Sequence, residues 1–261
     1  MDWIKNLQDQ LHDKEVYEIQ NIFYDSAKEL MNNFTLKIDS LEIELTEIEF
    51  YYFECQDHQD LYVHLDELQK EMGYLYVHKK GNGRGGIDLT FGNNEFFGGI
   101  LLRGIKDGGT FVAGPSKVRE YISKKLGIED KDHKVLQEFF GKPGKPNKIC
   151  LQKRDKSKNE HNVLHSVRIG LKEEVDETFC KALYRFVRLD YLEEKKDDIK
   201  FNTYTNLKDR TKLKAISCLT KVCDEFSNEK AMTAQIKKDE ILCSLINKFN
   251  EQSRHKAVIC K

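Results

Sequence analysis

Residues 34–53 alternate between apolar and polar side chains, which is the pattern of a strand with one buried face. The first apolar positions on that face are Leu41, Ile43 and Leu45. If the strand stays regular, Glu47, Glu49 and Tyr51 continue this face, and Ile48, Phe50 and Tyr52 take the polar one. A carboxylate on a buried face is costly unless it is paired, hydrogen-bonded or protonated, so both glutamates are candidates for chemistry. The alternative is a bulge or an exit from the sheet that returns both glutamates to solvent.

Further segments continue the strand pattern. They are residues 73–78, 87–91, 98–105, 163–171 and 182–189. Glycine-rich turns separate the first three, so we expect an antiparallel sheet. Gly114, Pro115 and Ser116 then open a helical pattern, because proline and a hydroxyl are favoured at a helix N-terminus. Residues 141–161 hold two prolines and many lysines, which predicts a mobile basic loop.

The patterns divide the chain into three parts. Residues 1–32 have apolar side chains near helical spacing and predict an N-terminal segment of one or two amphipathic helices. Residues 33–191 predict an α+β domain with a mixed, mostly antiparallel curved sheet and flanking helices. A charge run opens a helical C-terminal extension at 192–261. Its two helical patterns, at 207–226 and 231–249, predict a hairpin that either packs on the sheet or serves a protein partner.

Composition limits the classes of protein. With 261 residues, the chain can bury a substantial core without disulfides or metals, so its stability requires no cofactor. Its formal net charge of -1 counts against a strongly basic nucleic-acid binder, although a local basic patch is compatible with it. The 7 cysteines lack metal-ligand spacing and predict reduced thiols in a cytoplasmic protein. No apolar run approaches the roughly 18 residues of a membrane span, so we expect no membrane partner.

The familiar catalytic motifs are absent or lack their context. Gly81, Gly83 and Gly86 satisfy GxGxxG, but a dinucleotide fingerprint needs a following helix, and the strand-like IDLTF follows here. The cluster instead predicts backbone bends or close approach to a ligand. No P-loop, GxSxG, HExxH or kinase motif set is present, which removes the commonest hydrolase and phosphotransferase classes.

Aromatic and histidine side chains gather in the same central stretch. Four tyrosines are either sheet residues or, beside carboxylates, a stacking slot for a flat heterocycle: Tyr51, Tyr52, Tyr74 and Tyr76. We rank His64 and His78 above His58 as pocket residues, because they flank the predicted pocket elements. The alternative for each is a surface or hydrogen-bonded histidine.

The order of the motifs resembles one family. The chain reads TEIEFYYF, GYLYVH, a GIDLTFG to GGILLRGI hairpin, AGPSKV, SVRIGL and ALYRFVR. This order and spacing resemble the alkyladenine (3-methyladenine) DNA glycosylase family, over about residues 30–191. The resemblance implies that family's curved-sheet fold, which is similar to the C-terminal domain of formyltransferases. It also implies base excision in DNA repair, without a metal or other cofactor.

The resemblance also implies roles for individual residues. Glu49 corresponds to the family's general-base glutamate, Tyr51 to a tyrosine that stacks on the extruded base, and Arg103 to an arginine that helps to hold the nucleophilic water. Asp88 corresponds to the family's asparagine, and His64 takes the place of its pocket histidine without a matching spacing. Glu49 and Arg103 are therefore the candidate catalytic residues. Substrate binding is assigned to Tyr51, His64, Tyr76, His78, Arg84 and Asp88.

The implied chemistry is hydrolysis of an N-glycosidic bond. A carboxylate activates water, a pocket binds the departing purine, and a duplex substrate must first have its base flipped out. The chain differs from the family in two ways: KKGNGRGG stands where relatives carry an aromatic wedge, and the chain is not basic. Either the wedge lies elsewhere, or the substrate is single-stranded DNA, RNA, or a free nucleoside or nucleotide. A third alternative is a non-catalytic binding module on the same fold.

Overall fold

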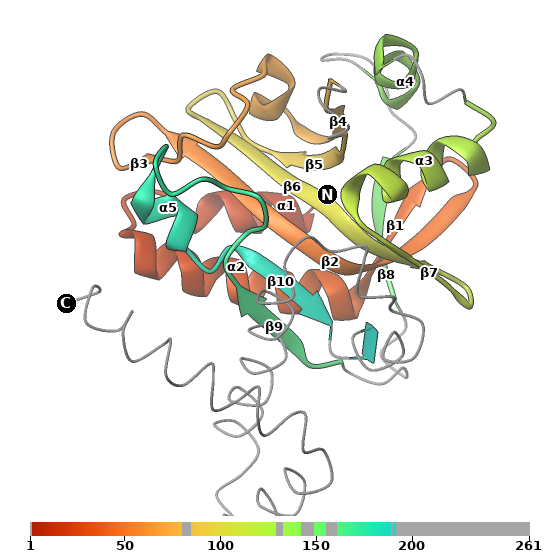
Figure 1. Cartoon of the computed structure of the whole chain (residues 1–261), viewed down its shortest axis with the longest axis horizontal. Coiled ribbons are helices and arrows are strands. Elements are labelled where there is room, and N and C mark those ends of the chain that lie inside the picture. Colours follow the sequence, from red (N-terminus) through yellow and green to blue (C-terminus); the bar gives the residue numbers. More distant parts are fainter. Residues whose placement is uncertain are drawn as a thin grey trace, which may run out of the picture.

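The computed structural model describes residues 2–79, 85–128, 133–141, 149–154, 161–188 and 190–191. These residues form an α+β structure around a curled antiparallel sheet (Figure 1). The strands are β1 Phe34–Ile38, β2 Leu41–Glu54, β3 His58–Gln59, β4 Met72–Val77, β5 Ile87–Phe91, β6 Phe96–Asp107, β7 Thr110–Ala113, β8 Ile149–Lys153, β9 Val163–Ser166 and β10 Arg185–Arg188. The helices are α1 Asp2–Asp9, α2 Val16–Asn33, the 3-10 helix η1 Glu67–Lys70, α3 Pro115–Lys125, α4 His133–Phe140 and α5 Glu177–Lys181.

Strand β2 is the centre of the sheet. The strands lie in the order β4-β5-β6-β2-β1-β8, and β10 pairs with the middle of β2 and with β9. The short strands β3 and β7 pair with β2 and β6. Each of these pairings is antiparallel. Because β2 contacts four other strands, side chains from several distant segments meet over its two faces.

A bulge in β2 changes which side chains face the core. Leu45 pairs with Ile105 and Ile48 pairs with Leu102, and the register shifts on both sides of Glu47. The extra residue reverses the alternation, so Leu45 and Ile48 lie in the same hydrophobic core. The expectation of a regular strand is therefore wrong. The alternative was a bulge or sheet exit that returns both glutamates to solvent. A bulge is present, but Glu47 and Glu49 are only 1% and 0% exposed, so their predicted exposure is wrong.

Gly104 makes room for this bulge. It lies opposite Glu47 on β6, and a Cβ atom at residue 104 would lie 2.8 Å from both the Glu47 Cβ and the Thr46 Oγ1. Real Cβ atoms do not approach other atoms so closely, so a larger residue requires the two strands to separate. The glycine of the sequence LLRGI therefore allows the face change in β2.

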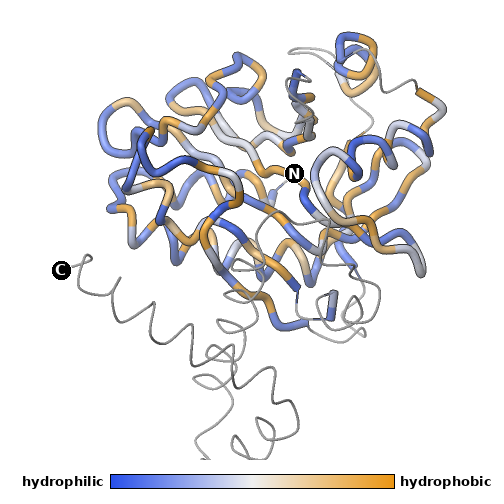
Figure 2. Tube along the Cα trace, in the orientation of Figure 1, coloured by the Kyte–Doolittle hydropathy of each residue, from blue (hydrophilic) through white to orange (hydrophobic). Residues whose placement is uncertain are grey.

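Helices α1 and α2 pack on the core face of the sheet (Figure 1). A capping box starts α2, because the side chains of Glu15 and Glu18 each bind a main-chain N–H at its first turn. Its apolar stripe places Phe23 in contact with Phe50 of β2, with the two rings stacked at 4.4 Å between centroids. Figure 2 shows that hydrophobic and hydrophilic residues alternate along the chain in the strands and helices. One continuous hydrophobic core thus joins the N-terminal helices to the sheet.

Most of the predicted elements lie where the patterns placed them. The strands predicted at 73–78, 87–91 and 98–105 correspond to β4, β5 and β6, and the helix predicted after Gly114 is α3. The segments 163–171 and 182–189 contribute β9 and β10. Residues 34–53 divide into two strands at a turn where Asp39 has a φ of 54°. No helix among the described residues is long and apolar enough to cross a membrane.

The prediction of a mobile loop at 141–161 is wrong for residues 149–153. These residues form β8, which pairs with β1 in register from Phe34 to Ile38. Ile149 is buried and Leu151 packs against the core, so the apolar residues of this segment extend the sheet. The helices predicted at 207–226 and 231–249, and the whole of 192–261, lie outside the described residues.

Candidate active site

One row of side chains crosses the sheet on the face opposite the main core. Its residues are direct cross-strand partners, in the order Tyr76, Asp88, Leu101, Glu49 and Arg185. Directly opposed residues in antiparallel strands have side chains on the same face, so β4, β5, β6, β2 and β10 present one continuous surface. Tyr51 and Arg103 lie two residues farther along β2 and β6 and share this face.

The Glu49 carboxylate lies at the centre of this row and is fully buried. Its Oε1 accepts the main-chain N–H of Ile169 at 2.8 Å. Its Oε2 accepts the Tyr51 hydroxyl at 3.0 Å and an Nη1–H of Arg103 at 3.4 Å. Because Ile169, Tyr51 and Arg103 all line the adjacent cavity, the carboxylate lies directly behind the cavity wall.

Glu47 anchors two arginines beside Glu49. Its Oε1 accepts hydrogen bonds from Nε of Arg103 at 3.0 Å and from Nε of Arg185 at 2.8 Å. Burial alone would raise the pKa of Glu47, but the charges of Arg185 and Arg103 outweigh burial and hold this pKa below its ordinary value. Burial would lower the pKa of Arg103, and Glu49 and Glu47 raise it above the ordinary value, so Arg103 stays charged.

Arg168 supports the ring of Tyr51 from the side of the post-β9 loop. Its guanidinium carbon lies 4.5 Å from the centre of the Tyr51 ring, within the range of a cation–π contact. The buried Arg168 side chain also donates to Asp60 Oδ2 at 2.6 Å and to the Phe179 carbonyl at 3.0 Å. Burial and the Glu49 charge raise the pKa of Tyr51 well above its ordinary value, so its hydroxyl stays protonated and donates to Glu49.

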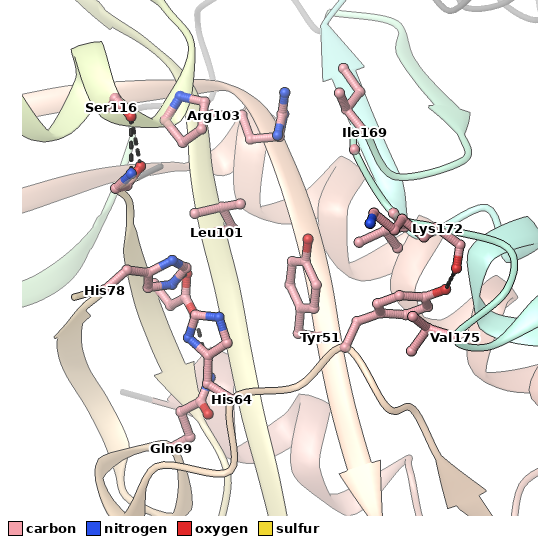
Figure 3. Close-up of a pocket in the computed structure, with 16 residues that line it drawn as sticks. Tyr51, His64, Gln69, His78, Leu101, Arg103, Ser116, Ile169, Lys172 and Val175 are labelled. Atoms are coloured by element: carbon pink, nitrogen blue, oxygen red, sulfur yellow. Dashed lines mark hydrogen bonds and ion pairs between the residues drawn. The ribbon is translucent and has the colours of Figure 1, made fainter. Parts of the chain in front are cut away.

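A cavity of about 530 Å³ opens over this row. This volume lies within the range of small-molecule binding sites. Figure 3 shows the rings of His64 and His78 on one side of the Tyr51 ring, with Leu101 between them, and Ile169, Lys172 and Val175 on the other side of Tyr51. The aromatic rings and the apolar Leu101 side chain give the space between the histidines and Tyr51 the shape and chemistry for a flat heterocycle.

The side of the cavity away from Glu49 holds a histidine and an aspartate. His78 Nε2 lies 2.7 Å from Oδ1 of Asp88, which is 2% exposed. Asp88 Oδ2 also accepts from Nε2 of Gln69 at 3.3 Å. The His64 ring lies 4.4 Å from the His78 ring between centroids, and His64 Nδ1 is 3.2 Å from the Tyr76 hydroxyl. The pKa of His64 lies below its ordinary value because part of its ring is buried and His78 lies beside it.

The structure brings most of the sequence-predicted site residues together. The cavity is lined by five of them, which are Tyr51, His64, His78, Asp88 and Arg103. Glu49 contacts this set from behind the wall, and Tyr76 contacts it through His64 while lining a second, smaller cavity. Arg84 lies outside the described residues. His58, which we ranked below the other two histidines, lies in the core between the main chain of Tyr52 and the hydroxyl of Tyr184.

Sequence reasoning missed three residues that build the site: Gln69, Arg168 and Arg185. Arg168 and Arg185 belong to SVRIGL and ALYRFVR, where each charged residue stands inside an otherwise apolar strand pattern. That signal indicates a buried, paired charge, since an isolated one is costly. Gln69 carries no comparable signal in the sequence.

Within the described residues, no group of three or more His, Cys, Asp or Glu side chains is arranged to hold a metal ion. The groups that the site offers to a ligand are a buried carboxylate, a charged guanidinium, an imidazole–carboxylate pair and aromatic rings. This set suits acid–base chemistry on a heterocyclic substrate. No protein-family model matches the chain, and a search of curated proteins finds no match.

Proposed function

We propose that this chain hydrolyses the N-glycosidic bond of a modified purine, with Glu49 as the base that activates water. The observation that carries the proposal is the buried contact of Glu49 with Tyr51 and Arg103, directly behind an aromatic cavity of about 530 Å³. Breaking this bond by hydrolysis needs a carboxylate near the sugar and a slot for the purine, and the position of Glu49 beside the aromatic cavity supports both roles.

Each residue around the slot has a role in this reaction. Tyr51 stacks on the purine, which is supported by its place opposite His64 and His78 (Figure 3). Arg103 holds Glu49 in position and stabilises negative charge on it, because the guanidinium contacts both Glu47 and Glu49. The Tyr51 hydroxyl donates to Oε2 of Glu49 and so fixes the orientation of the carboxylate.

The architecture supports the same proposal at the level of the fold. A curled antiparallel sheet with helices on its faces is the arrangement that the resemblance to alkyladenine DNA glycosylases and the C-terminal domain of formyltransferases implies. Fold alone does not determine activity, so the proposal depends on the site rather than on this likeness.

Release of a free base tests the proposed activity and its substrate together. The purified chain is incubated with duplex DNA, single-stranded DNA, RNA and free nucleosides or nucleotides that carry hypoxanthine, 1,N6-ethenoadenine or a methylated purine. Chromatography then detects the released base. We expect release from at least one class, and the class that reacts identifies the polymer or the free nucleoside. Absence of release from all of them would contradict the proposal.

A second candidate function is purine binding without cleavage. The observation that favours it is the complete burial of Glu49, whose two oxygens are already hydrogen-bonded to Tyr51, Arg103 and Ile169. This function predicts that the chain retains a purine nucleoside unchanged and that Glu49→Gln binds as tightly as the wild type. Detection of a released base therefore distinguishes the two candidate functions.

A further inference from the structure

We propose that His78, supported by Asp88, is the proton donor to the departing heterocycle. This inference rests on the proposed glycosidic hydrolysis and assigns a second catalytic residue to it. Cleavage of such a bond leaves an electron pair on the heterocycle, and protonation of a ring nitrogen stabilises this leaving group. The candidate donor must therefore face the heterocycle from the side away from the base that activates water.

The register of the sheet places the two groups in this way. Glu49 on β2 and Asp88 on β5 are both direct partners of Leu101 on β6, so they lie on opposite sides of β6. Two strand spacings separate their positions, which corresponds to roughly 10 Å. Figure 3 shows the His78 ring on the far side of the cavity from Tyr51, with Leu101 between them. A heterocycle stacked on Tyr51 thus has a carboxylate on one side and an imidazole on the other.

The contacts of His78 identify the nitrogen that can transfer a proton. Nε2 is engaged by Asp88 at 2.7 Å, which leaves Nδ1 for a ligand. A Cβ atom at residue 86 would lie 3.2 Å from Nδ1, so a residue larger than glycine at this position would crowd this nitrogen. The His78 side chain is 15% exposed and lines the cavity. Asp88 is buried and fixes the orientation of the ring through its contact with Nε2.

Charged and titratable groups from several elements surround His78. Asp88 on β5 contacts Nε2 of His78, and the His64 ring lies 4.4 Å from the His78 ring between centroids. The Tyr76 ring lies 5.3 Å from the His78 ring, and Arg119 on α3 donates to the main-chain carbonyl of His78 at 2.8 Å. Asp88 is hydrogen-bonded to His78, whereas Nδ1 of His64 contacts the Tyr76 hydroxyl, so His78 is the ring of this pair that a carboxylate holds.

The proposed step balances without a co-reactant. Water gives a proton to Glu49 as its oxygen bonds to the anomeric carbon. The carbon–nitrogen bond breaks, its electron pair goes to the heterocycle, and a heterocycle nitrogen takes the proton from Nδ1 of His78. The products are the free base and a sugar with a new hydroxyl, and exchange with solvent restores both side chains.

Substrates that differ in leaving-group charge test this role. Hypoxanthine and 1,N6-ethenoadenine leave as anions unless they are protonated, whereas 7-methylguanine is cationic in the substrate and leaves without an added proton. We expect His78→Gln to slow release of the neutral bases by about 100-fold or more, the scale of general acid catalysis, and release of 7-methylguanine by less than about 10-fold. Asp88→Asn should also slow release of the neutral bases more than release of 7-methylguanine, but by a smaller factor than His78→Gln does.

The pH profile gives a second readout that a packing defect would not change selectively. Wild-type release of neutral bases should decline as the pH rises, because the leaving heterocycle takes a proton from the protein, and release of 7-methylguanine should lack this limb. His12→Gln is the matched control, because its side chain is 42% exposed and lies at Glu54 and Glu95, away from the cavity. Melting curves of each variant establish that it is folded.

The outcomes are distinct. Equal losses for both leaving-group classes, or no loss, in folded His78→Gln would overturn the proton-donor role while leaving the hydrolysis in place. If the wild-type chain releases no base from any substrate, the proposed function itself fails, and the role of His78 fails with it. A selective loss confined to neutral bases supports both.

Discussion

At the scale of single residues, Tyr51 combines two contacts that mutation can separate. Its hydroxyl donates to Glu49, and its ring faces the cavity and contacts Arg168 on the loop after β9. In the proposed function the ring stacks on the substrate, and the hydroxyl contacts Oε2 of Glu49. The sequence pattern identified both Glu49 and Tyr51, but it could not reveal that the two side chains are hydrogen-bonded to each other, since their contact depends on side-chain conformation.

Tyr51→Phe and Tyr51→Leu should therefore differ. Phenylalanine keeps the stacking ring, so we expect binding of 1,N6-ethenoadenosine to stay within about 3-fold of wild type. Leucine removes the ring and should weaken binding by about 1–3 kcal/mol, the usual contribution of stacking on a base. Fluorescence titration measures both affinities. An equal loss in the two variants would show that the ring does not stack on the heterocycle.

His58 predicts an acid-sensitive stability. Burial lowers the pKa of His58 to about 4 from an ordinary value of 6.5. Between these values the unfolded chain binds a proton that the folded chain does not, so the free energy of unfolding falls as the pH drops from 6.5 to about 4. We expect His58 to contribute roughly 3 kcal/mol of this loss. Urea unfolding of wild type and His58→Gln across this range should give a shallower pH dependence in the variant, and parallel curves would contradict the assignment.

At the scale of elements, the bulge in β2 decides what the site contains. The strand pattern placed Glu47 and Glu49 on the buried face of Leu41, Ile43 and Leu45; both glutamates are buried, but on the other face of the sheet. It could not locate the bulge, because one extra residue changes the face without changing the composition. Nor could it foresee that arginines from β6 and β10 keep both glutamates buried, since this depends on the non-local pairing of strands.

Gly104→Ala should disturb this element selectively. The new Cβ would lie 2.8 Å from the Cβ of Glu47, so we expect the free energy of unfolding to fall by about 1–3 kcal/mol, the usual cost of overpacking. Gly109→Ala is the matched control, because a Cβ at that position meets no atom within 4 Å. Urea unfolding measures the difference. Equal stability of the two variants would show that the bulge tolerates a side chain at residue 104.

At the scale of the whole molecule, the site is assembled by the sheet rather than by any one motif. Tyr76, Asp88, Leu101, Glu49 and Arg185 come from five strands and align only because those strands pair in register. Sequence patterns predicted the strands β4, β5 and β6 well, since turns bound each of them. The places of β8 and β10 in the sheet, and of the loop after β9 against Glu49, depend on contacts between residues that are more than 100 positions apart.

Single-turnover release of base by wild type and Glu49→Gln measures the central claim most directly. The control is Glu42→Gln on the same strand, whose side chain is 51% exposed. With substrate bound at saturation, we expect Glu49→Gln to be slower by about 100-fold or more, as for loss of a general base, and Glu42→Gln to match wild type. A folded Glu49→Gln variant that binds the purine and releases it at the wild-type rate would contradict the account.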